Sequence, residues 1–177
     1  MLDGNASSDS AKDIYRKMAA LFTQVDKFNE AAECLKAVIM EEKQELLKVG
    51  LLTKMAGNYK KANMASECID TSKEAYELMK RLTSETDPQT CRTKINLGQV
   101  YQHFEMNDEA KALYQEYLDM FAEHSSEGGA AVDAVLDWSN VQAYTKLRDF
   151  AMVAIDEIDG GDDEEEYYDE EDDGEKK

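Results

Sequence analysis

Residues 94–117 read KINLGQVYQHFEMNDEAKALYQEY, and this stretch decides the fold of the chain. Its spacing predicts two short helices packed back to back, with small and large residues sharing one face of each. Those faces hold Leu97, Gly98 and Tyr101 in the first helix and Ala110, Tyr114 and Tyr117 in the second. Gly98 and Ala110 fall where the two backbones approach closely, so the larger side chains interlock around them. One such pair cannot bury its apolar face alone, which predicts further copies along the chain.

This pattern resembles the tetratricopeptide repeat (TPR), whose signature is Leu-Gly-x-x-Tyr in a first helix and Ala-x-x-x-aromatic in a second. The resemblance implies an all-α fold, a right-handed superhelical stack of about four TPR-like helix pairs over residues 11–158. It also implies that the chain binds other proteins rather than catalysing a reaction. An irregular helical bundle is the alternative that the spacing leaves open.

Three further copies follow the pattern with lower fidelity. The first has Tyr15, Met18, Ala19, Phe22, Phe28, Ala31, Leu35 and Val38; the second has Leu46, Val49, Gly50, Thr53, Tyr59, Ala62, Ser66 and Ile69; the fourth has Trp138, Val141, Thr145, Phe150, Ala154 and Ile158. Aligning Ala31, Ala62, Ala110 and Ala154 gives steps of 31, 48 and 44 residues, against about 34 in the usual repeat. The longer steps are similar to the extended repeats of kinesin light chains and of TPR proteins found in cilia.

Capping residues and helix breakers set the expected boundaries. Ser10, Asn29 and Asn107 are the predicted N-caps, and Pro88 marks a point where one helix stops and another starts. The predicted organisation is a flexible N-terminus at residues 1–10, a helical repeat domain at 11–158, and a disordered acidic tail at 159–177. Runs of β-branched residues are absent from the sequence, which disfavours strands.

The tail is the second strong feature. Residues 156–177 contain fourteen Asp or Glu and two Lys, a net charge of −12 out of −19 for the whole chain, which leaves −7 for residues 1–155. Such a run repels itself and cannot build a core, so we expect it to be disordered. It either keeps the protein soluble or attracts basic proteins such as histones. Tyr167 and Tyr168 add two aromatic anchors inside the charge.

The first helices of stacked TPR units line a concave surface, and residues off their packing stripes point into it. The residues expected to bind a partner are Arg16, Lys17, Lys48, Leu51, Lys54, Met55, Arg92, Asn96, Gln99, His103, Asn140 and Lys146, with Ala20, Thr23, Gln102, Ala143 and Leu147 beside them. This set contains basic residues and no acidic one. It predicts a groove for an extended or helical peptide that bears acidic residues, with amides for the peptide backbone and Leu51 and Met55 as an apolar floor.

Two further expectations concern the ends of the chain. The acidic tail has a high effective concentration near a basic groove, so it could occupy that groove until a partner displaces it. The predicted last helix, Asp149–Ile158, is short, so Ala151, Val153, Ala154, Ile155 and Ile158 would leave an apolar edge that a partner or a second copy of the chain could cover.

Several classes of protein are disfavoured by the sequence. No apolar run approaches the ~20 residues of a membrane span, and the polar, acidic start does not read as a signal peptide. Cys34, Cys68 and Cys91 are expected to be reduced core residues. His103 and His124 lie without the partners of a catalytic or metal site. We therefore expect no cofactor and no catalysis, and the net charge disfavours direct binding of nucleic acid.

Two functional hypotheses remain. The first is a cytoplasmic scaffold or adaptor that holds a peptide segment of a larger assembly, with motor or axonemal complexes of the cilium or flagellum as the setting that the family resemblance implies. The second is a nuclear, histone-chaperone-like protein that shields a basic client with the acidic tail. The first places binding in the groove, and the second places it in residues 159–177.

Overall fold

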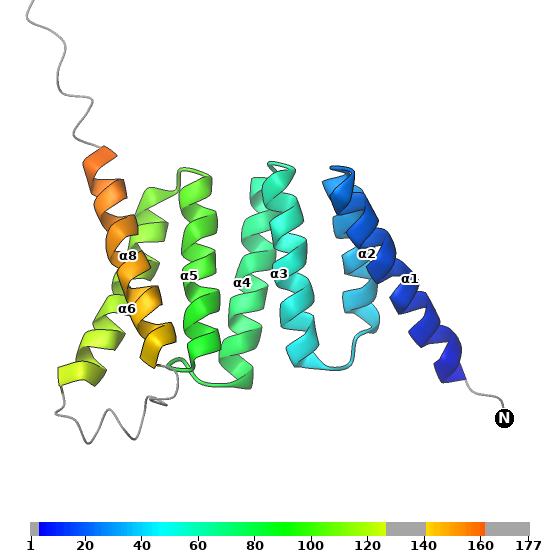
Figure 1. The fold of residues 1–177 in the computed structure, drawn as a ribbon, viewed down its shortest axis with the longest axis horizontal. Coiled ribbons are helices and arrows are strands. Elements are labelled where there is room, and N and C mark those ends of the chain that lie inside the picture. Colours follow the sequence, from blue (N-terminus) through cyan, green and yellow to red (C-terminus); the bar gives the residue numbers. More distant parts are fainter. Residues whose placement is uncertain (1–3, 127–140, 162–177) are drawn as a thin grey trace, which may run out of the picture.

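The computed structural model describes residues 4–126 and 141–161, and within these ranges it contains seven α-helices and no strand. They are α1 (Gly4–Gln24), α2 (Phe28–Glu41), α3 (Glu45–Lys61), α4 (Ala65–Leu82), α5 (Pro88–His103), α6 (Asn107–Ser126) and α8 (Val141–Gly161). The helices stand side by side in a row, with α1 at one end and α8 near the other (Figure 1). Each helix packs mainly on its neighbours in sequence, as expected for an all-α stack of helix pairs.

Three pairs, α1–α2, α3–α4 and α5–α6, are closed by the same turn. Each turn has a non-glycine residue in the left-handed conformation: Asp26 (φ 59°), Asn63 (φ 56°) and Glu105 (φ 60°). The next residue donates its N–H to a carbonyl five positions earlier: Lys27 to Phe22 (2.9 Å), Met64 to Tyr59 (2.9 Å) and Met106 to Tyr101 (3.0 Å). This is the Schellman geometry that ends many helices. Its recurrence gives the repeat steps directly, 37 residues and then 42.

The second predicted copy is therefore out of register. Ala62 was expected to be the equivalent of Ala110, but Ala62 directly follows α3 and lies in the turn. Cys68 takes that place instead: its N–H bonds the carbonyl of Met64 just as the N–H of Ala110 bonds that of Met106, and its side chain is fully buried. The predicted steps of 31 and 48 residues are corrected to 37 and 42.

The fourth predicted pair is divided at the wrong place. Residues 141–161 form one continuous helix, so the stretches around Thr145 and Ala154 do not belong to two separate helices. No Pro or Gly interrupts the sequence between these two positions, and nothing forces the helix to stop. Ala151, Ala154 and Ile158 are buried against α5 and α6 rather than left as an open edge. Trp138 lies outside the described residues.

Helix boundaries confirm some expectations and correct others. Asp87 caps α5 by accepting the N–H of Gln89 at 2.8 Å, with Pro88 in the first turn, as predicted. In contrast, α1 begins at Gly4 rather than after Ser10, α2 begins at Phe28, and Asn107 is the first residue of α6. Residues 159–161 belong to α8, and the remaining tail lies outside the described residues. None of the described helices has the length and apolar character needed to cross a bilayer.

Two clusters of buried side chains fill the row, one drawn from α1 to α5 and the other from α4 to α8. Tyr114 and Tyr117 are fully buried, and Tyr144 of α8 is 2% exposed. The hydroxyl of Tyr117 donates to the carbonyl of Tyr144 at 2.8 Å, and the hydroxyl of Tyr144 donates to the carbonyl of Thr86 at 2.7 Å. These bonds tie α8 to α6 and to the loop before α5. The three cysteines are buried and unpaired, as expected.

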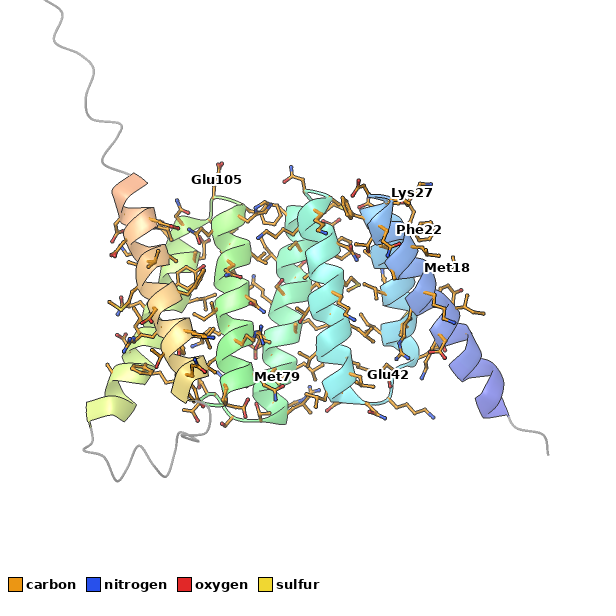
Figure 2. The ribbon with its side chains drawn as sticks, in the orientation of Figure 1. Met18, Phe22, Lys27, Glu42, Met79 and Glu105 are labelled. Atoms are coloured by element: carbon orange, nitrogen blue, oxygen red, sulfur yellow. The ribbon has the colours of Figure 1, made fainter. Side chains whose placement is uncertain are left out.

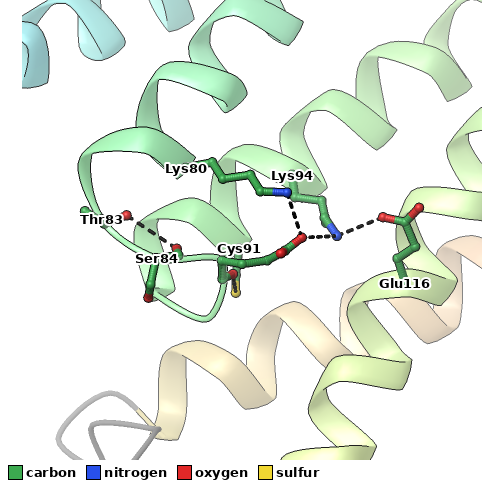
Figure 3. A network of polar contacts seen from close by, with 7 residues as sticks. Lys80, Thr83, Ser84, Cys91, Lys94 and Glu116 are labelled. Atoms are coloured by element: carbon green, nitrogen blue, oxygen red, sulfur yellow. Dashed lines mark hydrogen bonds and ion pairs between the residues drawn. The ribbon is translucent and has the colours of Figure 1, made fainter.

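A polar network supports the turn between α4 and α5 (Figure 3). The ammonium group of Lys94 lies 2.9 Å from a carboxylate oxygen of Glu116 and 3.8 Å from one of Glu85, which also accepts from Lys80 at 3.1 Å. The side chain of Lys94 is only 8% exposed, so its charge is satisfied by carboxylates rather than by water alone.

Candidate protein-binding groove

Three hollows lie between successive first helices of the array. The first, about 510 Å³, is lined by Arg16, Ala19, Ala20, Thr23, Leu35, Leu51, Lys54, Gly57, Asn58 and Lys61. The second, about 140 Å³, is lined by Thr53, Ala56, Gly57, Lys60, Ser72, Ala75, Thr93, Asn96, Gln99 and Val100. The third, about 490 Å³, is lined by Pro88, Gln89, Arg92, Gln142, Ala143, Lys146 and Leu147. We call the three together the groove. It runs from α1 across α3 and α5 to α8.

The groove is basic. Its cations are Arg16, Lys54, Lys60, Lys61, Arg92 and Lys146, and within the described part of the chain no Asp or Glu lines it. The chain as a whole carries 39 acidic and 20 basic side chains, so an all-cationic lining is not the average surface of this protein. A concave surface with charges of one sign concentrates the electrostatic field and attracts ligands of the opposite sign.

The structure brings together more than half of the predicted binding residues. Those that line the groove are Arg16, Leu51, Lys54, Arg92, Asn96, Gln99 and Lys146, together with Ala20, Thr23, Ala143 and Leu147. Asn96 and Gln99 lie in the middle hollow, where their amides can pair with a peptide backbone. Leu51 is 8% exposed and provides the apolar floor of the first hollow.

The other predicted residues lie elsewhere. Met55 packs in the hydrophobic core, as Leu51 does, but unlike Leu51 it lines none of the three hollows. Lys17 and Lys48 do not line any of the three hollows. His103 is exposed at the end of α5, where its ring packs edge-on against Phe104 with ring centroids 4.8 Å apart. Asn140 lies outside the described residues.

The helical periodicity missed several groove residues. They are Gly57, Asn58, Lys60 and Lys61 at the end of α3, and Gln142 at the start of α8. The four α3 residues were missed because the register error assigned Tyr59 and Ala62 to the following helix. The correct signal was Asn63, a residue type that tolerates the left-handed conformation and marks where α3 must end.

One groove cation is held by a buried carboxylate. A carboxylate oxygen of Glu42 lies 2.9 Å from the guanidinium of Arg16, and the side chain of Glu42 is 7% exposed. Glu42 lies at the turn between α2 and α3 (Figure 2) and accepts the N–H groups of Lys43 and Gln44 at 2.9 and 3.1 Å. The hydrogen bond from the Gln44 N–H is the main effect that holds the pKa of Glu42 below its usual value. Burial alone would raise this pKa, but the hydrogen bonds and the positive charges of Lys12 and Arg16 together lower it.

Two lysines of α3, Lys54 and Lys61, are less engaged by internal contacts than Arg16. Lys54 forms no ion pair with any described residue, and the ammonium of Lys61 lies over the ring of Phe28 at 5.4 Å from its centroid. A partner carboxylate therefore finds positive charge in the first hollow that no internal carboxylate neutralises. In the part of the chain that the structure describes, no group of three or more His, Cys, Asp and Glu residues is placed to hold a metal ion.

Comparisons with known proteins agree with this geometry. Residues 48–123, which span α3 to α6, match the model of the tetratricopeptide repeat family. Among solved structures, a crystal structure of BtubC (BKLC) from P. vanneervenii is similar in fold, with a TM-score of 0.50 and 15% sequence identity over 88% of this chain and 72% of that one. No curated protein sequence matches this chain. At that identity the BtubC likeness concerns the fold alone.

Proposed function

We propose that this chain, whose residues 48–123 match the tetratricopeptide repeat family, is a scaffold for protein–protein interaction that holds an acidic peptide segment of a partner protein in the groove. In this proposal the protein is a non-catalytic adaptor. The peptide is extended or helical, runs across α1, α3, α5 and α8, and carries Asp or Glu side chains toward the cations of the groove.

One observation carries the proposal: among the residues that the structure describes, six cations and no carboxylate line the three hollows of a chain whose net charge is −19. Charge complementarity of this kind raises association rates and rejects partners of the wrong sign. Asn96 and Gln99 supply backbone-directed amides in the central hollow, which an extended peptide can use whatever its sequence. Leu51 adds an apolar contact.

The setting is a separate part of the proposal. The corrected repeat steps of 37 and 42 residues still exceed the usual length of about 34, which supports the resemblance to extended-repeat TPR proteins. We propose on this resemblance that the partner belongs to a motor or axonemal assembly in the cytoplasm or cilium. No physical property of the groove depends on that setting.

The test uses a fluorescent decapeptide of glutamate and a matched one of lysine, measured by anisotropy against the full chain at low and high salt. Lys54→Glu should weaken binding of the glutamate peptide by about five- to tenfold, since one reversed contact is worth roughly 1 kcal/mol at a protein surface. Lys36→Glu on the exposed side of α2 makes the same change in net charge outside the groove and should change affinity less than twofold.

Two results would contradict the proposal. Equal losses in Lys54→Glu and Lys36→Glu would show that net charge, not the groove, sets the affinity. Preferential binding of the lysine peptide, abolished by removing residues 162–177, would instead favour the histone-chaperone-like function of the tail. Measuring the binding of core histones to the truncated chain and to Lys54→Glu then separates the two functions. The truncation leaves the groove intact, and Lys54→Glu leaves the tail intact.

A further inference from the structure

The first helix presents an apolar stripe to solvent. Ile14, Met18, Leu21 and Val25 lie on or just after α1, and their exposures are 54%, 37%, 61% and 62%. Their spacing along the chain is four, three and four residues. This is the spacing of the two apolar positions of a heptad, which places all four side chains in one line along a helix.

The stripe points away from the rest of the molecule. Arg16, Ala20 and Thr23 line the groove, and at 100° per residue they lie on the side of α1 opposite to the stripe. Helix α1 stands at the end of the row, and Met18 lies on its outer side (Figures 1 and 2). An apolar stripe at the end of a repeat array normally receives another helix or is replaced by a polar cap.

The size of the stripe limits what can cover it. At their exposures the four side chains leave roughly 400 Å² of apolar surface, within the range of the largest patches on soluble monomers, which are often functional. Two such stripes facing each other would bury roughly 800 Å² plus their flanks, which is less than the ~1,200 Å² of a stable specific interface and falls among weak, transient ones. The complex should therefore be reversible rather than permanent.

We propose that this stripe binds the same stripe of a second copy of the chain, as an antiparallel pair of α1 helices. In that arrangement Ile14 packs against Val25 of the second copy, and Met18 packs against Leu21 of the second copy. The pair has a two-fold axis that lies between Met18 and Leu21. This axis generates each of the two contacts a second time, so each stripe residue of one copy packs against a stripe residue of the other. The stripe is self-complementary without any change in backbone.

The flanking residues favour this partner and this direction. On one side of the seam Lys17 lies beside Gln24 of the second copy, and on the other Tyr15 lies beside Phe22 of the second copy. A parallel pair would instead place the Lys17 ammonium beside Phe22. The antiparallel pair thus matches polar with polar and aromatic with aromatic.

The local charge also permits the approach. Residues 11–27 contain four basic and two acidic side chains, a net charge of +2 in a chain of −19. The residues around the stripe therefore lack the excess of negative charge that the whole chain carries. Because the stripe and the groove are on opposite sides of α1, the dimer leaves both grooves open and can hold two peptides of one partner with increased avidity.

The test is sedimentation velocity of the full chain from about 1 to 200 μM. The wild-type chain should change reversibly from monomer toward dimer within this concentration range, as expected for a weak, transient interface. Leu21→Glu should be monomeric throughout the range, with unchanged helix content by circular dichroism. Met40→Glu removes an even more exposed side chain, 79% exposed, from α2 outside the stripe and should dimerise like the wild type.

A monomeric wild-type chain at 200 μM would overturn the proposal, as would equal losses in Leu21→Glu and Met40→Glu. Removing residues 162–177 should leave the dimer intact, and loss of the dimer on this truncation would identify the tail as the occupant instead.

Direction is tested by mixing Ile14→Cys and Val25→Cys chains under mild oxidation, since the native cysteines are buried. The mixed disulfide should exceed either self-product. An excess of the Ile14→Cys self-product would show a parallel pair and reject the proposed direction.

Discussion

Gly98 of α5 lies directly against the phenol ring of Tyr114 of α6. A Cβ atom added at Gly98 would overlap Cε1 of Tyr114 and lie 2.9 Å from Cζ and 3.1 Å from Cδ1. The ring is fully buried, and its hydroxyl donates to the side-chain oxygen of Gln102 at 3.2 Å. Burial raises the pKa of Tyr114 to about 12, with the charge of Glu157 adding to the effect. The ring is thus fixed by packing and by a hydrogen bond, and it has little room to move aside.

Overpacking a core costs about 1–3 kcal/mol, and alanine normally gains about 1 kcal/mol over glycine in a helix interior. We therefore expect Gly98→Ala to lower the free energy of unfolding by a net amount of up to about 2 kcal/mol. Gly50 of α3 is the matched control because a Cβ there meets no atom within 4 Å. Gly50→Ala should stabilise the protein in urea titrations, and equal effects of both substitutions would contradict the close approach of α5 and α6.

This contact was predictable from the sequence, whereas the preceding repeat was not. Two buried tyrosines follow Ala110 at four and seven residues and make the α5–α6 pair unmistakable. In α4 the equivalent places after Cys68 are held by Ser72 and Ala75, which are buried but give no aromatic signal. Without that signal the alignment was placed on Ala62, six residues before Cys68.

The left-handed turn at Glu105 leads to a second prediction. Glu105 has φ 60° and an exposed side chain, and glutamate does not adopt this conformation readily. Glu105→Gly should raise the free energy of unfolding by about 1 kcal/mol, because glycine has no Cβ penalty there. The measurement is thermal unfolding. Asn63→Gly at the equivalent turn should gain less, since asparagine tolerates the conformation, and a larger gain at Asn63 would reject this explanation.

The groove shows what helical spacing can resolve. Its basic character was predicted, because residues such as Lys54 and Arg92 lie well off the packing stripes. Leu51 and Met55 are one turn apart on α3 and were assigned the same role, yet only Leu51 lines a hollow. A shift of some 40° around the helix separates a groove wall from the core, and that shift depends on how α3 packs against its neighbours.

Glu42 leads to a prediction about pH. Its folded-state pKa is lowered, chiefly by the Gln44 N–H, so its contribution to stability is present above its unfolded pKa of about 4.3 and is lost as pH falls through the folded value. Glu42→Gln should cost about 1.5–3 kcal/mol at pH 7, the worth of hydrogen bonds to a charged group.

The difference in stability between the wild type and Glu42→Gln should begin to shrink near the unfolded pKa of about 4.3 and should keep shrinking as the pH falls through the lower folded-state pKa. Chemical unfolding from pH 7 to pH 3 provides the measurement. Glu74→Gln, an exposed position on α4, should run parallel to the wild type over this window. A constant difference between the wild type and Glu42→Gln down to pH 3 would mean that the charge of Glu42 is not what stabilises the turn.

Lys94 leads to the last prediction. Its ammonium bridges Glu116 and Glu85, and it lies 5.9 Å from the centroid of the Tyr76 ring, while the aliphatic chain is buried. Burial alone would lower the pKa of Lys94, but the hydrogen bond to Glu116 and the nearby negative charges outweigh it and raise the pKa. Lys94→Ala should lower the free energy of unfolding by about 2–3 kcal/mol through lost packing and hydrogen bonding.

Lys94→Met should recover most of that loss, because both carboxylates are half exposed and can be solvated when the ammonium is removed. Lys80 is the second lysine that forms an ion pair with Glu85, and its side chain is exposed. Lys80→Ala should therefore lower the free energy of unfolding by less than about 1 kcal/mol, as is usual for exposed ion pairs. Urea titrations of the three variants at pH 7 make the comparison. A methionine variant as unstable as the alanine variant would show that the ion pair with Glu116, rather than the buried aliphatic chain, holds α5 against α6.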